Sequence, residues 1–160
     1  MSTGDGEREA RRAFAAACRA LARRGLGARE LEEKLSRREF SPGIISDTLA
    51  RLRREHLLDE GEVAGAVARS GERRGLGSRR VAQTLVRRGI DALASEPALA
   101  DLRAGDLLRA RALLARRHPE GLPADARSRA RLGRFLLGRG FPFEVVARVL
   151  RERGVSDDAD

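Results

Sequence analysis

A five-residue segment, Arg-Arg-Gly-Leu-Gly, occurs twice in this chain, at residues 23–27 and again at residues 73–77. Aligning the two copies also brings apolar residues into register, and a third copy follows without the pentapeptide. The aligned columns are Leu31, Val81 and Leu132; Leu35, Leu85 and Leu136; Phe40, Ile90 and Phe141; and Leu49, Leu99 and Leu150. A period of about 50 residues is typical of tandem structural units. The sequence therefore predicts three small units in series.

Within each unit the apolar residues recur at intervals of three and four, which predicts helices, and no segment alternates as a strand would. The expected helices cover residues 9–24, 28–38 and 42–55, then 60–74, 78–88 and 92–102, and finally 106–117, 124–139 and 144–153. Pro97 lies inside one of them and should bend or shorten it. The predicted fold class is all-α.

The repeated pentapeptide has the composition of a helix end followed by a helix start. Arg23 and Arg24 complement the negative end of a helix dipole, and Gly25 can adopt the left-handed conformation that closes the last turn. Gly27 can act as the next N-cap, and Glu30 supplies half of a capping box.

These patterns predict a division of the chain into five parts. We expect a disordered lead-in at residues 1–12, three-helix units at residues 13–57, 58–103 and 104–153, and an acidic tail at residues 154–160. Because a unit of this size buries little surface alone, the units should support one another in an elongated helical-repeat module.

Basic residues outnumber acidic residues by 33 to 24, and every basic residue except Lys34 is arginine. The excess favours an anionic partner, since arginine can contact phosphate or carboxylate through two N–H groups at once. A genome-wide preference for arginine codons would also explain the scarcity of lysine, but not the clustering of charge. Residues 69–88 hold seven arginines and only one acidic residue, Glu72.

The candidate binding residues come from this segment and from the corresponding helix of the third unit. Helical winding of residues 78–88 turns Val81 and Leu85 inwards and Arg80 outwards. The matching outward positions of the first unit are Glu30, Glu33 and Arg37, which predicts an acidic face there. For any single arginine, the alternative is an ordinary solvated helix surface. The candidates are Arg69, Arg73, Arg74, Arg79, Arg80, Arg87, Arg88, Arg131 and Arg134.

No catalytic, metal or cofactor motif is found. His56 and His118 have no second ligand at metal-binding spacing, and the paired glycines of the pentapeptides lack the third glycine and the preceding strand of a dinucleotide loop. Cys18 is the only cysteine and falls on an apolar face, which favours a buried side chain and a reducing compartment. No apolar run approaches the roughly 20 residues of a membrane span. We expect a cytoplasmic, monomeric, non-enzymatic protein without cofactors.

Several motifs, in this order, resemble the RecX family of regulators of the RecA recombinase. The resemblance covers residues 13–153 and rests on residues 57–60 with Val63 and Ala64, on residues 69–70, on residues 75–81 with Leu85 and residues 89–90, and on residues 134–141. The chain departs from the family at Val63 and Val67, where aromatic residues are common, and at Pro97.

The resemblance implies three tandem three-helix units in an extended, curved module that lies in the helical groove of a RecA filament on single-stranded DNA. Such a module suppresses ATP hydrolysis and strand exchange, with roles in recombination, repair and the SOS response. The expected partners are RecA and single-stranded DNA, contacted directly or through RecA. One alternative is a helix-turn-helix protein that binds duplex DNA itself. Ser78, Arg79 and Arg80 could begin its recognition helix, although Ala28 and Glu30 in the first copy do not fit. A purely structural repeat scaffold is the third interpretation.

Overall fold

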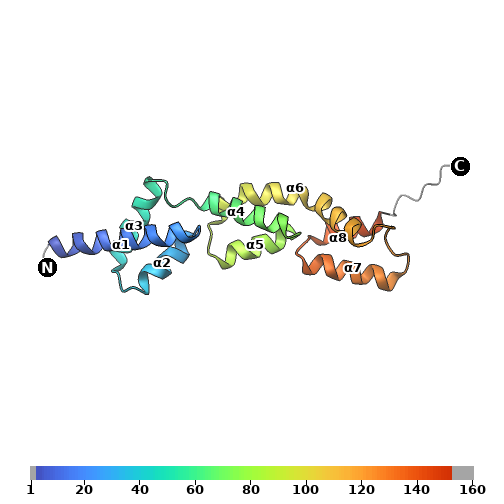
Figure 1. The fold of residues 1–160 in the computed structure, drawn as a ribbon, viewed down its shortest axis with the longest axis horizontal. Helices are drawn as coiled ribbons and strands as arrows, with labels where there is room; N and C mark the ends of the chain where they lie inside the picture. The colour runs from blue at the N-terminus through green and yellow to red at the C-terminus, as the bar shows by residue number, and fades with distance from the viewer. Residues whose placement is uncertain (1–2, 153–160) are drawn as a thin grey trace. The chain divides into compact units, whose positions relative to one another are not determined.

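The computed structural model describes residues 3–152 and contains only helices over that range (Figure 1). They are α1 (Thr3–Arg23), α2 (Ala28–Ser36), α3 (Pro42–Arg54), α4 (Glu60–Arg73), α5 (Ser78–Arg87), α6 (Ala92–Arg117), α7 (Ala126–Gly138) and α8 (Phe143–Arg151). The predicted all-α fold class is confirmed.

Contacts within the described residues separate two compact units. The first contains residues 3–65 and 85–95, and the second contains residues 66–84 and 96–152. This division differs from the predicted one because the middle repeat, residues 58–103, is divided between the two compact units. The boundaries at residues 57, 103 and 153 therefore stay a prediction.

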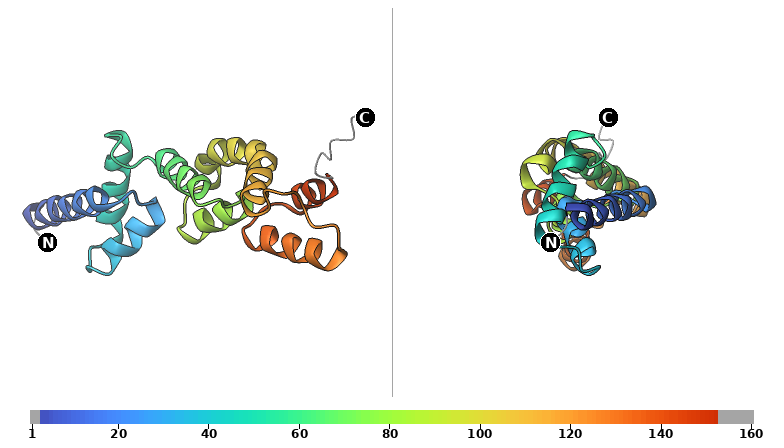
Figure 2. Two further views of the ribbon diagram at one scale, coloured as in Figure 1. Left: turned by 45° about the vertical axis from the view of Figure 1, so that its right-hand side comes forward. Right: turned by 90° about the vertical axis from the view of Figure 1, so that its left-hand side faces the viewer.

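In the first compact unit, α1, α2 and α3 enclose one apolar core. Leu31 and Leu35 of α2 and Leu52 of α3 are at most 1% exposed. From α1, the core takes the small side chains of Ala16 and Ala17, which allow α3 to cross it closely (Figure 2). Cys18 is half-buried against this core.

In the second compact unit, α7 and α8 pack with the last turns of α6. The core residues there are Ala110, Leu114, Leu132, Leu136, Phe141, Val146 and Val149. The predicted columns of Leu35, Leu85 and Leu136 and of Leu31, Val81 and Leu132 are all buried. In the outermost column only Leu49 is buried, whereas Leu99 and Leu150 are half-buried.

The N-terminal prediction is wrong for the residues that the structure describes, because α1 begins at Thr3 rather than near residue 9. Asp5 lies in the first turn, where a negative charge complements the helix dipole. Arg8 pairs with Asp5 at 2.9 Å and Arg11 with Glu7 at 3.6 Å, and such spaced pairs favour helix. The predicted acidic tail lies outside the described residues.

The prediction of two helices over residues 92–117 is also wrong, since α6 is continuous. Ser95 makes the first backbone bond of the helix, to Asp91, so Pro97 removes only one bond near its start. Further along, the Arg109 guanidinium donates to the Leu102 carbonyl at 2.5 Å. A Cβ on Gly105 would lie 2.5 Å from Arg109 Nη1. The absence of a side chain at Gly105 therefore leaves room for the Arg109 guanidinium to contact the Leu102 carbonyl.

The two ends of the α7–α8 pair are held by side chains. Asp125 is the N-cap of α7 and accepts from the Ser128 backbone N–H at 2.8 Å, and this bond lowers the pKa of the Asp125 carboxyl. Glu152 follows α8 and accepts from Arg111 of α6, with Nε at 2.7 Å. Hydrogen bonding to Arg111 lowers the pKa of Glu152.

Candidate interaction site

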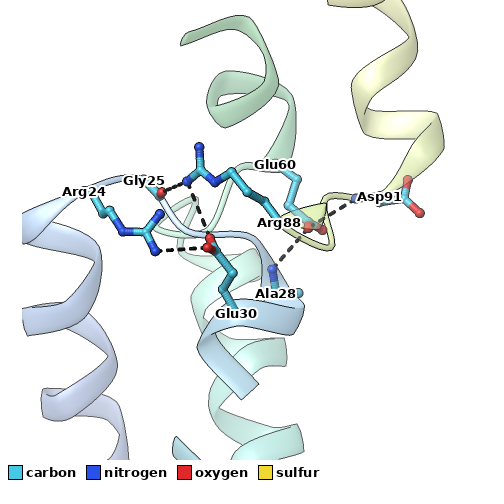
Figure 3. A network of polar contacts seen from close by, with 7 residues as sticks. All are labelled: Arg24, Gly25, Ala28, Glu30, Glu60, Arg88 and Asp91. Carbon is cyan, nitrogen blue, oxygen red and sulfur yellow. Dashed lines mark hydrogen bonds and ion pairs between the residues drawn. The ribbon is translucent and has the colours of Figure 1, made fainter. Parts of the chain in front are cut away.

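The first pentapeptide packs against the turn between α5 and α6, within the first compact unit. Arg88 Nη2 donates to the Gly25 carbonyl at 2.6 Å and lies 3.4 Å from Glu30 Oε2, while Arg24 pairs with the other oxygen of Glu30 at 3.0 Å (Figure 3). Arg88 is therefore already engaged inside the protein. We call this contact the first joint.

Glu60, the first residue of α4, completes the first joint. Its Oε1 accepts from the backbone N–H of Ala28 at 3.1 Å and from that of Asp91 at 3.4 Å (Figure 3). The start of α2 is thus capped by a carboxylate 32 residues away. The predicted half capping box is wrong, because Glu30 pairs with Arg24 and Arg88 instead of bonding back to the start of α2.

Gly25 also differs from the prediction, since its backbone is not left-handed. A Cβ at this position would lie 3.0 Å from Val63 Cγ2, and the Gly25 carbonyl is the acceptor for Arg88. The glycine serves close packing here. Gly75, its counterpart in the second copy, does have the left-handed conformation, with φ of 66°.

The second pentapeptide makes the same kind of contact with the turn between α7 and α8, within the second compact unit. The Gly77 N–H donates to the Arg139 carbonyl at 2.9 Å, and the Arg79 N–H donates to the Gly140 carbonyl at 3.0 Å. Arg139 Nη1 donates to the Arg74 carbonyl at 2.7 Å, as Arg88 does to Gly25 in the first joint. We call this contact the second joint.

Asp106 of α6 has the role in the second joint that Glu60 has in the first. It is fully buried and accepts from the Ser78 N–H at 3.1 Å and the Ser78 hydroxyl at 2.5 Å. Arg109 pairs with Asp106 at 2.7 Å and with Glu72 at 3.2 Å. Each copy of the pentapeptide therefore packs against a turn of the next repeat. The helix that follows each copy is capped by a carboxylate distant in sequence, Glu60 for α2 and Asp106 for α5.

Gly77→Ala should test the second joint. The added Cβ would lie 2.3 Å from the Phe141 backbone nitrogen and 2.4 Å from the Gly140 carbonyl, and backbone atoms cannot move aside easily. We expect the free energy of unfolding, measured by urea denaturation, to fall by about 1 to 3 kcal/mol. Gly138→Ala is the control, because nothing lies within 4 Å of its Cβ and alanine favours helix. Equal stability of the two variants would contradict the close approach of Gly77 to the backbone of Gly140 and Phe141.

Around the second joint lies a group of arginines that we call the joint arginine cluster. Arg139 is half-buried and holds the Arg74 carbonyl, while the backbones of Arg79 and Arg80 lie against Gly140. The guanidinium of Arg139 lies 5.2 Å from the centre of the Phe135 ring, and that of Arg117 lies 4.7 Å from it. The members are Arg73, Arg74, Arg79, Arg80, Arg117 and Arg139.

The joint arginine cluster carries uncompensated positive charge. Within residues 3–152, none of its members forms an ion pair. The nearest part of α4 does contain an acidic residue, Glu72, but that carboxylate pairs with Arg109. The cluster can therefore bind an anion without first breaking an internal pair.

The arginines predicted to bind a partner lie in different parts of the structure. Arg73, Arg74, Arg79 and Arg80 belong to the cluster, while Arg88 is part of the first joint. Arg69 of α4 and Arg87 of α5 are exposed and each makes a further contact. On α7, Arg131 and Arg134 are exposed, and the charge of Arg131 contributes to lowering the pKa of Asp125, after the Ser128 hydrogen bonds.

Sequence reasoning missed Arg117 and Arg139. Arg139 stands one repeat after Arg88 in the aligned sequence, so the repeat itself carried the signal for its role at a joint. The sequence carried no such signal for Arg117, because it is linked to Arg139 only through the Phe135 ring that both guanidinium groups contact.

The expected acidic face of the first unit is wrong as well. Glu33 lies 3.5 Å from Arg29 and 3.7 Å from Arg37, and Glu30 is held by Arg24 and Arg88. Neighbouring arginines thus neutralise both carboxylates.

Metal ligands and membrane spans can be assessed over residues 3–152, the part of the chain that the structure describes. No three His, Cys, Asp or Glu side chains there are grouped so that they could hold a metal ion. No helix of that part has the length and apolar character needed to cross a membrane.

Comparison with known proteins gives one consistent result. Residues 13–52 match the family description "RecX, first three-helix domain", and residues 106–150 match "RecX, third three-helix domain". The regulatory protein RecX of Halorhodospira halophila is 42% identical over 131 residues, which cover 82% of this chain and 81% of the relative. RecX of Pseudomonas savastanoi pv. phaseolicola is 37% identical over 137 residues, covering 86% and 88%.

The fold agrees with these sequence matches. The crystal structure of RecX from Lactobacillus salivarius superposes with a TM-score of 0.79 at 19% identity, covering 91% of this chain and 96% of the other. The helical-repeat architecture is thereby confirmed. With two domain descriptions in agreement with relatives that are matched over more than four fifths of their length, the chain belongs to the RecX family of regulatory proteins.

Proposed function

We propose that this protein binds the RecA filament on single-stranded DNA and inhibits its ATP hydrolysis and strand exchange. Its relatives are named regulatory proteins, and the motifs noted above resemble a family that acts on RecA. The observation that carries the proposal is the joint arginine cluster, which offers positive charge with no internal ion pair among the described residues. Its ligands are acidic side chains or phosphate groups on the filament.

The cluster is held in place by backbone contacts rather than by salt bridges. The bonds of Gly77 and Arg79 to the α7–α8 turn position the arginines at the start of α5. Stacking on Phe135 orients Arg139 and leaves guanidinium N–H groups for a partner. Preorganised donors lose less conformational entropy on binding, which favours an interaction surface.

The alternative of a duplex-reading helix is less well supported. A recognition helix presents its first turn to the bases of the major groove. Here the Ser78 N–H and hydroxyl are bound by Asp106, and the Arg79 N–H is bound by Gly140. Ser78 is 3% exposed, so only the long side chains of Arg79 and Arg80 remain for a partner.

We further propose a mode of action, a location and an oligomeric state for the protein. It acts without catalysis, as a cytoplasmic monomer in recombination and repair, and meets single-stranded DNA directly or through RecA. Its three units at residues 13–57, 58–103 and 104–153 form a helical-repeat module that can contact more than one RecA subunit.

Changing Arg79 and Arg80 together to alanine tests the proposed function. Both side chains are exposed, so the melting temperature should change little. A hydrogen bond to a charged group contributes about 1.5 to 3 kcal/mol, so losing two should raise the concentration for half-inhibition of RecA's DNA-dependent ATP hydrolysis about 100-fold or more. Added salt should weaken the parent protein more than the variant.

A matched control is available in the first compact unit. Arg53 and Arg54 are also adjacent, exposed arginines at a helix end without an ion pair among residues 3–152. Their double alanine variant should inhibit as the parent does. Inhibition by the Arg79 and Arg80 variant that equals the parent at every salt concentration would overturn the proposal. Equal binding to bare duplex DNA would favour the alternative.

A further inference from the structure

A second basic surface lies in the first compact unit, in a groove between α1 and α2. The groove encloses about 370 Å³. Its basic lining residues are Arg19, Arg23, Arg24, Lys34, Arg37 and Arg38, and no carboxylate lines it. This surface belongs to different helices from the joint arginine cluster.

Most of these positive charges are not neutralised. Arg24 pairs with Glu30 and Arg37 with Glu33, both at the edge of the groove. The side chains of Arg19, Arg23, Lys34 and Arg38 are exposed, and none of these four forms an ion pair within residues 3–152. An anionic ligand would therefore meet four available cations.

The groove continues along α1 towards its N-terminal end. A second hollow, which includes Arg11, Arg12 and Phe40, shares Arg19 and Arg38 with the first. From Arg11 to Arg24 the surface extends roughly 20 Å at 1.5 Å per helical residue. That length suits about four turns of a helix or a short extended segment.

The floor of the groove is aliphatic rather than aromatic. It consists of Ala16, Ala20, Leu26, Leu31 and Leu35. Proteins that bind single-stranded nucleic acids commonly offer rings on which bases stack. Among the residues that line the two hollows, Phe40 is the one ring, and the Arg12 guanidinium already lies 6.0 Å from its centre. Small aliphatic side chains fit such a floor better than bases do.

We propose that the α1–α2 groove binds an acidic amphipathic peptide segment of a partner protein. Carboxylates of that segment would pair with Arg19, Arg23, Lys34 and Arg38, and its aliphatic side chains would lie on the floor. This is the groove-binding mode of amphipathic helices, with the charge pattern setting the choice of partner. The proposal goes beyond the joint arginine cluster and does not depend on it.

The test uses the full chain and a fluorescein-labelled, 14-residue helical peptide with glutamates on one face and leucines at i and i+4. Two control peptides replace the leucines by serine or the glutamates by glutamine, and a labelled oligo-dT of equal length tests phosphate. We expect the parent protein to bind the first peptide at least tenfold more tightly than either control peptide, by fluorescence anisotropy. Arg19→Glu with Arg38→Glu should weaken that binding at least tenfold.

The matched variant Arg53→Glu with Arg54→Glu carries the same charge change outside the groove and should bind as the parent does. If the charge reversal in the groove lowers the helical signal in circular dichroism, Arg19→Gln with Arg38→Gln replaces it, since both side chains are exposed. The proposal is overturned if the serine peptide binds as tightly as the leucine peptide, or if the groove variants lose oligo-dT binding instead. Inhibition of RecA should persist in the groove variants, so the two proposals fail separately.

Discussion

Asp106→Ala is expected to lower the free energy of unfolding by about 3 to 5 kcal/mol, the usual cost of removing one partner from a buried ion pair. Asp106 is fully buried and accepts bonds from the Ser78 N–H, the Ser78 hydroxyl and Arg109. Alanine would leave the start of α5 without its cap and Arg109, which is 16% exposed, without that partner. Urea denaturation followed by circular dichroism measures the change.

Asp101→Ala is the matched control, because Asp101 lies on the same helix and is exposed. Its effect should stay within about 0.5 kcal/mol. Asp106→Asn should fall between the two, since the amide oxygen can still accept from Ser78 while the charge facing Arg109 is lost. If Asp106→Ala were as stable as Asp101→Ala, the carboxylate would not hold the second joint.

Truncation of the repeated leucines is expected to have the second largest effect. Leu35, Leu85 and Leu136 are at most 1% exposed and stand at one position of the repeat. Each change to alanine removes a buried side chain and leaves a void, which typically costs 2 to 5 kcal/mol. Thermal and urea unfolding of the three single variants would measure these losses.

Exposed leucines provide the comparison for this series. Leu93 is 85% exposed and Leu108 is 72% exposed, so their alanine variants should change stability by no more than about 0.5 kcal/mol. Losses of similar size at Leu93 and at Leu85 would mean that the aligned column does not mark the core.

Helix positions were predictable where their signals are local. Ser41 and Pro42 start α3 as expected, and Gly27 is the N-cap of α2. The apolar columns identified the buried faces of α2, α5 and α7, because the helical period places them on one side. The start of α1 and the continuity of α6 were not predicted. In α1 the first turns contain the Arg8–Asp5 ion pair, and in α6 the Arg109 guanidinium donates to the Leu102 carbonyl across the expected break.

The candidate site was predictable only in part. The density of arginine along residues 69–88 pointed to Arg74, Arg79 and Arg80, which form no ion pair within the described residues, and their binding role stays a prediction. It also included Arg88, which is bound to Gly25 and Glu30. Charge density does not distinguish an arginine that binds a partner from one that holds its own chain, because both occupy similar sequences.

The repeat, the helical class and the inward face of the helices follow from the amino-acid sequence alone, because period and turn chemistry act over a few residues. The tertiary structure decided which carboxylate caps which helix. Glu60 reaches Ala28 and Asp106 reaches Ser78 across 32 and 28 residues of chain. Such bonds depend on two glycine-containing turns approaching the next turn closely, at Gly27 and Gly77. No local pattern encodes that distance, since it arises only when the helices between those residues have packed.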